Sequence, residues 1–207
     1  MEIFKETMII RVVAILFLLV FASFEAKKFI SKSKEDLSIE SIKKEINLKS
    51  GDIIVKKEEN ELSNYLATFD SSGYSQIGLI IDTKYGFKVV HIDIDEKNDE
   101  LQISDLNDFV NFSTKIAVYR YKDEIDVKKL SDIINDLQKS NTKFDYDFYL
   151  NNDKLYSTEL INYIYFKLFG EDLFTYLSSF YEKDEISINS IIKNPKLEKK
   201  FEIDFKF

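Results

Sequence analysis

KLYSTELINYIY, from Lys154 to Tyr165, places a small hydroxyl residue between a polar turn and an apolar run. The apolar residues after Ser157 recur at helical spacing as far as Gly170, which predicts a helix that ends at this glycine. Many hydrolases keep their nucleophile at the head of such a helix. Ser157 is therefore a candidate nucleophile, a replacement for one, or only a helix N-cap.

Outward from this helix, the chain alternates short strand-like runs with amphipathic helices. Strand patterns lie at 50–57, 75–82, 85–95, 115–121 and 201–207, and helical patterns at 61–69, 104–110 and 126–139. The connection from Lys84 to Gly86 predicts an antiparallel hairpin, and Ser104 is the expected N-cap of the helix at 104–110. We expect an α+β fold in which a small antiparallel sheet packs against helices.

The composition argues against several classes of function. The 207-residue chain has a net charge of -8, which argues against a nucleic-acid partner because such proteins need a basic face. With no cysteine and a single histidine, His91, the chain has no disulfides, no thiolate chemistry and no multi-histidine metal site. The carboxylates Asp145, Asp147, Asp153 and Glu159 fit no calcium-loop spacing. We expect neither a cofactor nor a metal ion.

The first 26 residues are predicted to be a signal peptide or a membrane anchor. Their uncharged run from Val12 to Phe24 would span about 20 Å as a helix, less than the ~30 Å hydrocarbon core of a bilayer. That length suits a signal peptide cleaved near 20–22, while an uncleaved anchor and a buried core helix are the alternatives. We expect residues 27–50 to form a tether with a short helix, and 51–207 to form one domain outside the cytoplasm.

Three segments of the chain together carry a resemblance to a known family. They are GDIIVKK from Gly51, YSQIGLII from Tyr74, and FDYDFYLNNDKLYSTELINYIY from Phe144. In this order and spacing they resemble the YiiX/YebB-like cysteine hydrolases of the NlpC superfamily, which have a permuted papain-like fold. The resemblance runs from about Gly51 to Tyr165. It implies amide or ester substrates in lipid or cell-wall peptide contexts.

The family pattern has five blocks: a Gly-Asp turn, Tyr-Ser-His-x-Gly with the catalytic base, a third polar residue on the adjacent strand, a strand-ending Arg, and Tyr-Cys-Ser/Thr-Glu-Leu with the nucleophile. Here Gln76 stands where the family has His, and Ser157 stands where it has Cys. His91 falls at the third polar position. The matching positions are Gly51, Asp52, Tyr74, Ser75, Gly78, Arg120, Tyr156, Thr158, Glu159 and Leu160. The resemblance implies a site at Ser157, Gln76 and His91, with Tyr74, Ser75, Tyr156, Glu159 and Arg120 as supporting residues.

The two substitutions remove the groups on which thiolate chemistry depends. A Cys at a helix N-terminus has a lowered pKa that favours the thiolate, and a neighbouring imidazole completes the ion pair. Serine instead needs a base that takes its proton during attack. The amide of Gln76 cannot accept that proton, although it can donate or accept a hydrogen bond.

Three functions remain open. The chain is a catalytically degenerate hydrolase that binds a lipid or peptide-like ligand in the old cleft. Alternatively, it is a rewired serine amidase or esterase in which His91 is the base for Ser157, which requires the two side chains to come within hydrogen-bond distance. The third possibility is a membrane-anchored interaction module with an aromatic-rich partner surface.

Overall fold

The computed structural model describes residues 46–93, 99–150, 152–180 and 183–205. The predicted signal peptide or anchor at 1–26 and most of the tether at 27–50 lie outside these residues. Among the described residues, no helix is both long enough and apolar enough to span a membrane.

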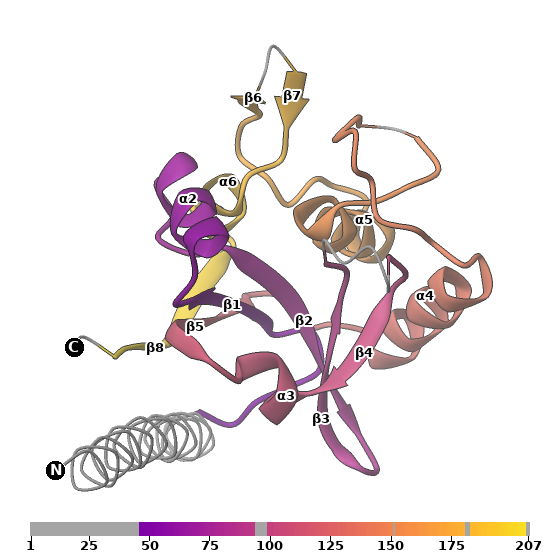
Figure 1. The fold of residues 1–207 in the computed structure, drawn as a ribbon. Coiled ribbons are helices and arrows are strands. Elements are labelled where there is room, and N and C mark those ends of the chain that lie inside the picture. The colour runs from indigo at the N-terminus through magenta and orange to yellow at the C-terminus, as the bar shows by residue number, and fades with distance from the viewer. Residues whose placement is uncertain (1–45, 94–98, 151, 181–182, 206–207) are drawn as a thin grey trace, which may run out of the picture.

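A six-stranded antiparallel sheet forms the centre of the fold, with strand order β4-β3-β2-β1-β5-β8 (Figure 1). Its strands are β1 (Ile53–Glu58), β2 (Gln76–Thr83), β3 (Gly86–His91), β4 (Gln102–Asp105), β5 (Ser113–Tyr121) and β8 (Leu197–Asp204). The predicted hairpin is confirmed, because β2 and β3 pair antiparallel and close at Thr83 and Gly86. A separate two-stranded hairpin consists of β6 (Ser178–Phe180) and β7 (Lys183–Glu185).

Five helices pack around this sheet within the described ranges. They are α2 (Glu61–Phe69), α3 (Leu106–Val110), α4 (Val127–Lys139), α5 (Ser157–Phe169) and α6 (Ile188–Ile192). Helix α5 ends where the sequence predicts, at Gly170, whose φ of 78° is the left-handed conformation that glycine tolerates. The prediction for Ser104 is wrong, because Ser104 belongs to β4 and Asp105 occupies the N-cap of α3.

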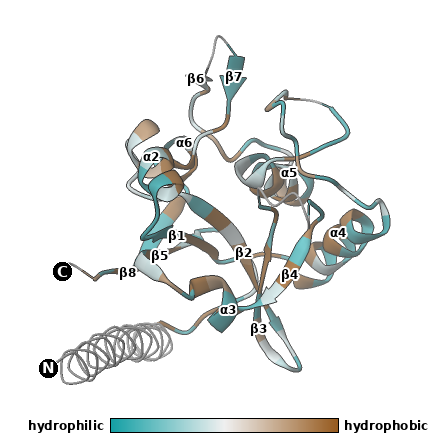
Figure 2. Cartoon of the chain, viewed as in Figure 1, coloured by the Kyte–Doolittle hydropathy of each residue, from teal (hydrophilic) through white to brown (hydrophobic). Residues whose placement is uncertain are grey.

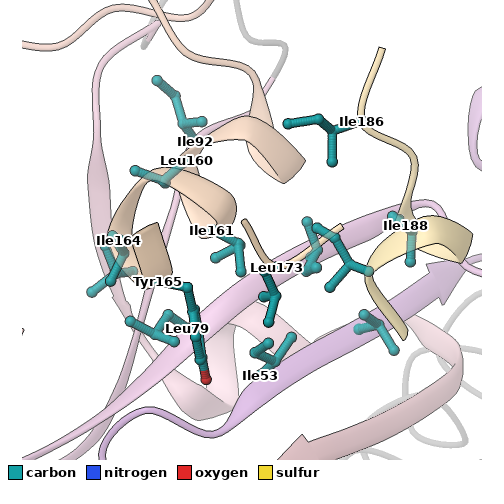
Figure 3. Packing of buried hydrophobic residues seen from close by; sticks show 14 of the residues in the cluster. Ile53, Leu79, Ile92, Leu160, Ile161, Ile164, Tyr165, Leu173, Ile186 and Ile188 are labelled. Carbon is teal, nitrogen blue, oxygen red and sulfur yellow. The ribbon is translucent and has the colours of Figure 1, made fainter. Parts of the chain in front are cut away.

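Each face of the sheet buries its own apolar cluster, because side chains of a strand alternate between the two faces. Helices α4, α5 and α6 cover one face, and Figure 3 shows Ile161 and Tyr165 of α5 over Ile53 and Leu79 of the sheet. Helix α3 covers the other face, where Phe109 packs with Val89. Figure 2 shows brown, hydrophobic positions along the strands and inside α5, whereas α4 alternates between teal and brown. This is the α+β architecture that the sequence predicts.

Candidate functional site

A cleft of about 340 Å³ opens between α2, the start of α5 and the segment that joins β7 to α6. The start of β2 and the residues that follow β3 also contribute to its wall. Its apolar lining includes Leu62, Leu66, Phe69, Phe144, Phe148 and Ile186. Clefts of this size that are mostly apolar, with a few polar groups, are typical of small-ligand sites.

Ser157 lines this cleft as the first residue of α5 and is half-buried. The N-cap of α5 is Tyr156, which has extended backbone angles and makes no side-chain capping bond. The interpretation of Ser157 as the N-cap is therefore wrong by one residue. Ser157 is instead within the first turn, where unpaired backbone N–H groups give the helix end a positive potential.

The residues on either side of Ser157 are bonded to one residue of the β7–α6 segment. The backbone N–H of Ile186 donates to the Tyr156 hydroxyl over 2.8 Å, and the Thr158 hydroxyl donates to the Ile186 carbonyl over 2.5 Å. Burial raises the pKa of Tyr156, so this phenol stays neutral. These two bonds fix the start of α5 against the residue that follows Glu185.

Gln76 begins β2 and lines the same cleft. It pairs across the sheet with Lys56 of β1. Its Oε1 atom is buried, and no described group donates a hydrogen bond to it. The structure thus brings together Ser157 and Gln76, the two residues that replace the family's nucleophile and base.

His91 does not line the cleft, which corrects its predicted place in the site. Its Nε2 atom is 2.8 Å from the Ser104 hydroxyl, and its ring packs edge-on against Phe109 at 5.1 Å between centroids. Phe109 belongs to the cluster on the α3 face of the sheet, whereas Val90, the preceding residue of β3, belongs to the α5 face. Strand alternation therefore directs His91 away from the face on which α5 packs.

Asp93, two residues further along, lines the cleft in place of His91. One of its carboxylate oxygens is 2.7 Å from His91 Nδ1, so the histidine ring contacts this carboxylate although it does not itself line the cleft. The DID run shows the carboxylates, but β3 ends at His91, so the alternation of strand side chains does not place Asp93. Which of these polar residues reaches the cleft depends on where the strand ends.

Tyr74 and Ser75 line the cleft and connect the start of β2 to distant elements. The Tyr74 hydroxyl donates to Glu202 of β8 over 2.8 Å, and burial raises the pKa of this phenol. Ser75 and Ser63 of α2 share a hydroxyl–hydroxyl hydrogen bond of 2.5 Å. Both residues therefore hold the start of β2 in place.

The other two supporting residues, Glu159 and Arg120, do not line the cleft. Glu159 is buried in α5. Arg120 forms an ion pair with Asp52 at the Gly-Asp turn. In this fold Arg120 therefore attaches the turn before β1 to β5.

The carboxylates near the YSTEL block organise a loop rather than a metal site. Asp145 is fully buried and accepts hydrogen bonds from the backbone of Asp147 and Tyr149 and from the side chain of Asn152. Within the described part of the chain, no group of three or more His, Asp or Glu side chains is arranged to hold a metal ion.

Two further carboxylates in the cleft, Glu185 and Asp70, carry no motif that the sequence reveals. Burial and the negative charge of Asp70 raise the pKa of Glu185 to about 7. Asp70 accepts hydrogen bonds from the backbone N–H groups of Ser72 and Asn189, at 2.8 and 3.0 Å. Only the tertiary structure brings these residues, more than a hundred positions apart, to one cleft.

Comparisons with known proteins agree with this geometry. The family profile described as "Permuted papain-like amidase enzyme, YaeF/YiiX, C92 family" matches residues 47–199. The crystal structure of a protein described as the metalloprotein yiiX from Escherichia coli O157:H7 has a similar fold, with a TM-score of 0.61 and 16% sequence identity. The match covers 73% of this chain and 95% of that one. No curated protein matches the sequence. The chain belongs to the YaeF/YiiX family of permuted papain-like amidases.

Proposed function

We propose that this protein is a catalytically degenerate member of its family, which binds a ligand in the cleft of the hydrolase scaffold. One observation carries the proposal. Ser157 and Gln76 line the cleft, while the single histidine of the chain packs on Phe109 and bonds to Ser104. The described lining of the cleft thus contains neither a thiol nor an imidazole.

The chemistry of these side chains supports a binding role. A serine hydroxyl at a helix N-terminus remains protonated near neutral pH and needs a base during attack. Gln76 is not a base, and His91 does not reach the lining. Loss of triad members costs on the order of 10⁶ in turnover, so a residual activity would be only ~10³ to 10⁴ above water.

We also propose that residues 1–26 tether the domain to a membrane or direct its export, with the domain outside the cytoplasm. The uncharged run from Val12 to Phe24 supports this assignment. Cell fractionation of the full chain beside a chain that begins at residue 27 tests it. Recovery of both chains in the cytosol would contradict the proposal.

The catalytic part is tested with a fluorophosphonate probe on the full chain, beside a Ser157→Ala variant. We expect no labelling of Ser157. Labelling that the Ala substitution removes would mean that this hydroxyl is activated, which contradicts degeneracy.

A second measurement shows whether a small molecule enters the cleft. If it does, the absence of fluorophosphonate labelling cannot be explained by a closed cleft. We expect an apolar fluorescent dye to bind the wild-type chain and to lose most of its affinity with Leu66→Glu, which places a charge in the lining. The matched control is Tyr85→Glu, which adds the same charge at a hairpin residue that is 78% exposed. Equal loss with both variants would contradict binding in the cleft.

A further inference from the structure

We propose that the ligand of this cleft is a small amphiphile that carries a protonated amine next to an apolar chain or ring. This inference rests on the proposed binding function and names the ligand class of the same site. Its two parts, the apolar and the cationic, are supported by different side chains of the cleft.

The apolar part is supported by an exposed apolar face of α2. Leu62, Tyr65 and Phe69 are 54%, 53% and 40% exposed, and all three line the cleft. Their spacing places them on one side of the helix, where the rings of Tyr65 and Phe69 stack at 6.1 Å. The same apolar surface continues through Phe144 and Phe148 on the other side of the cleft. An apolar chain bound in this cleft would bury the apolar side chains on both of its sides away from water.

The cationic part is supported by the charged residues of the cleft. Among the described residues, those of the lining that carry a formal charge are Asp70, Asp93 and Glu185, with no lysine or arginine. The nearby Lys183 donates to the Asp147 carbonyl and sits over the ring of Tyr149, so its ammonium is held outside the cleft. A ligand cation would meet acidic groups, whereas a carboxylate or phosphate would be repelled.

The partners of each carboxylate identify the one that most needs a ligand cation. Asp70 already accepts two backbone N–H bonds, and Asp93 lies next to His91. Within the described ranges no hydrogen bond or ion pair to the Glu185 carboxylate is found, and burial together with repulsion from Asp70 raises its pKa to about 7. An ammonium group near Glu185 would relieve both effects by stabilising the ionised form.

The positive N-terminus of α5 at Ser157 does not reverse the preference of the cleft for a cationic ligand. The N-terminus of α5 contributes the equivalent of about half a positive charge, which is less than the charge of one full carboxylate. Ile186 donates its backbone N–H to the Tyr156 hydroxyl and accepts from the Thr158 hydroxyl, which holds the neighbouring Glu185 close to this helix end. The polar end of the cleft therefore remains negative when Glu185 is ionised.

Calorimetric titration of the full chain with octylammonium, octanol and octanoate tests the inference, because the three ligands share one apolar chain. At pH 8 we expect octylammonium to bind about tenfold more tightly than octanol, and octanoate to bind most weakly. Glu185→Gln should remove most of the preference for the ammonium and leave octanol affinity unchanged. The matched control is Glu124→Gln, which removes the same charge at an exposed residue.

Each outcome separates the ligand class from the binding function. A preference that only Glu185→Gln abolishes supports the inference. Equal binding of the three ligands overturns it but leaves the apolar cleft intact. A preference that falls equally in both variants also overturns it, because general attraction to the acidic surface would then explain the result. Failure of all three ligands to bind contradicts the binding function itself.

Discussion

The guanidinium of Arg120 holds the carboxylate of Asp52 through two contacts of 2.7 Å, one from Nε and one from Nη2. The Asp52 side chain is buried, and it also accepts the backbone N–H of Lys49. Arg120 Nη2 donates in addition to the carbonyl of Asn47. The Arg120–Asp52 ion pair therefore attaches the segment before β1 to the end of β5.

Arg120→Met should lower the free energy of unfolding by about 2–4 kcal/mol, because it leaves a buried carboxylate without its cation. Arg120→Lys keeps the charge but loses the two-pronged geometry, so we expect an intermediate loss. Chemical denaturation of the three chains measures the effect. A Met variant as stable as the wild type would show that the pair does not stabilise the fold.

Tyr165→Phe should cost about 1–2 kcal/mol of stability, because the Tyr165 hydroxyl donates a 2.6 Å hydrogen bond to the Gly51 carbonyl. Tyr165 is fully buried, so no water replaces the lost donor. Tyr163→Phe is the matched control, since Tyr163 is 36% exposed on the same helix. Equal effects of the two variants would contradict a role for the buried bond.

Stability should fall as the pH rises from about 5 to 8, through the raised pKa of Glu185. The folded chain keeps this proton up to about pH 7, whereas the ordinary carboxyl loses it near 4.5, so the folded state binds more protons in between. After allowance for partial solvent exposure, the contribution is on the order of 1 kcal/mol. Denaturation of Glu185→Gln across this range should show a correspondingly flatter pH dependence. A slope identical to that of the wild type would count against the burial of this carboxyl.

Restoring the family residues should recover a reactive thiol. The chain has no cysteine, so Ser157→Cys introduces a single thiol. Combined with Gln76→His, it should react with iodoacetamide at neutral pH on the order of ten times faster than Ser157→Cys alone, because an imidazole in the cleft stabilises the thiolate. Ser131→Cys on the exposed side of α4 supplies the rate of an ordinary thiol. Equal rates for the single and double variants would show that the cleft no longer aligns the two positions.

His91→Asn should destabilise the fold without changing ligand binding in the cleft. The substitution disturbs the bond to Ser104 and the contact with Phe109, both on the α3 face of the sheet. We expect a loss of about 1–2 kcal/mol in unfolding experiments and an unchanged affinity for the apolar dye. A large loss of affinity in a folded variant would return His91 to the site.

Several regular elements could be predicted from a clear local signal, whereas the short elements β4, β6, β7 and α6 were not predicted. The hairpin of β2 and β3 follows from a glycine turn between apolar runs, and α4 from its strongly amphipathic repeat. Gln76 and Ser157 were found because each lies within a short block that the family pattern fixes. The start of α5 at Ser157 agrees with the predicted helix, whereas the N-cap is Tyr156 rather than Ser157.

The rest of the site depends on long-range geometry. The sequence places His91 and Asp93 on the same strand-like run, but it does not reveal that β3 ends between them. Glu185 and Asp70 become neighbours only when the segment before α6 meets the end of α2. No local pattern records such a meeting, so these carboxylates could not be found without the fold.

The hydrogen bond from Asn189 to Asp70 joins positions 119 residues apart. One wall of the cleft is therefore made by the ribosome long before the other. The end of α2 gains its hydrogen bond from Asn189 only after the segment of α6 has been made. Contacts this distant in sequence form slowly, and apolar surface that is exposed on an incompletely folded chain promotes aggregation. The cleft is therefore complete only once the residues around position 189 have been made.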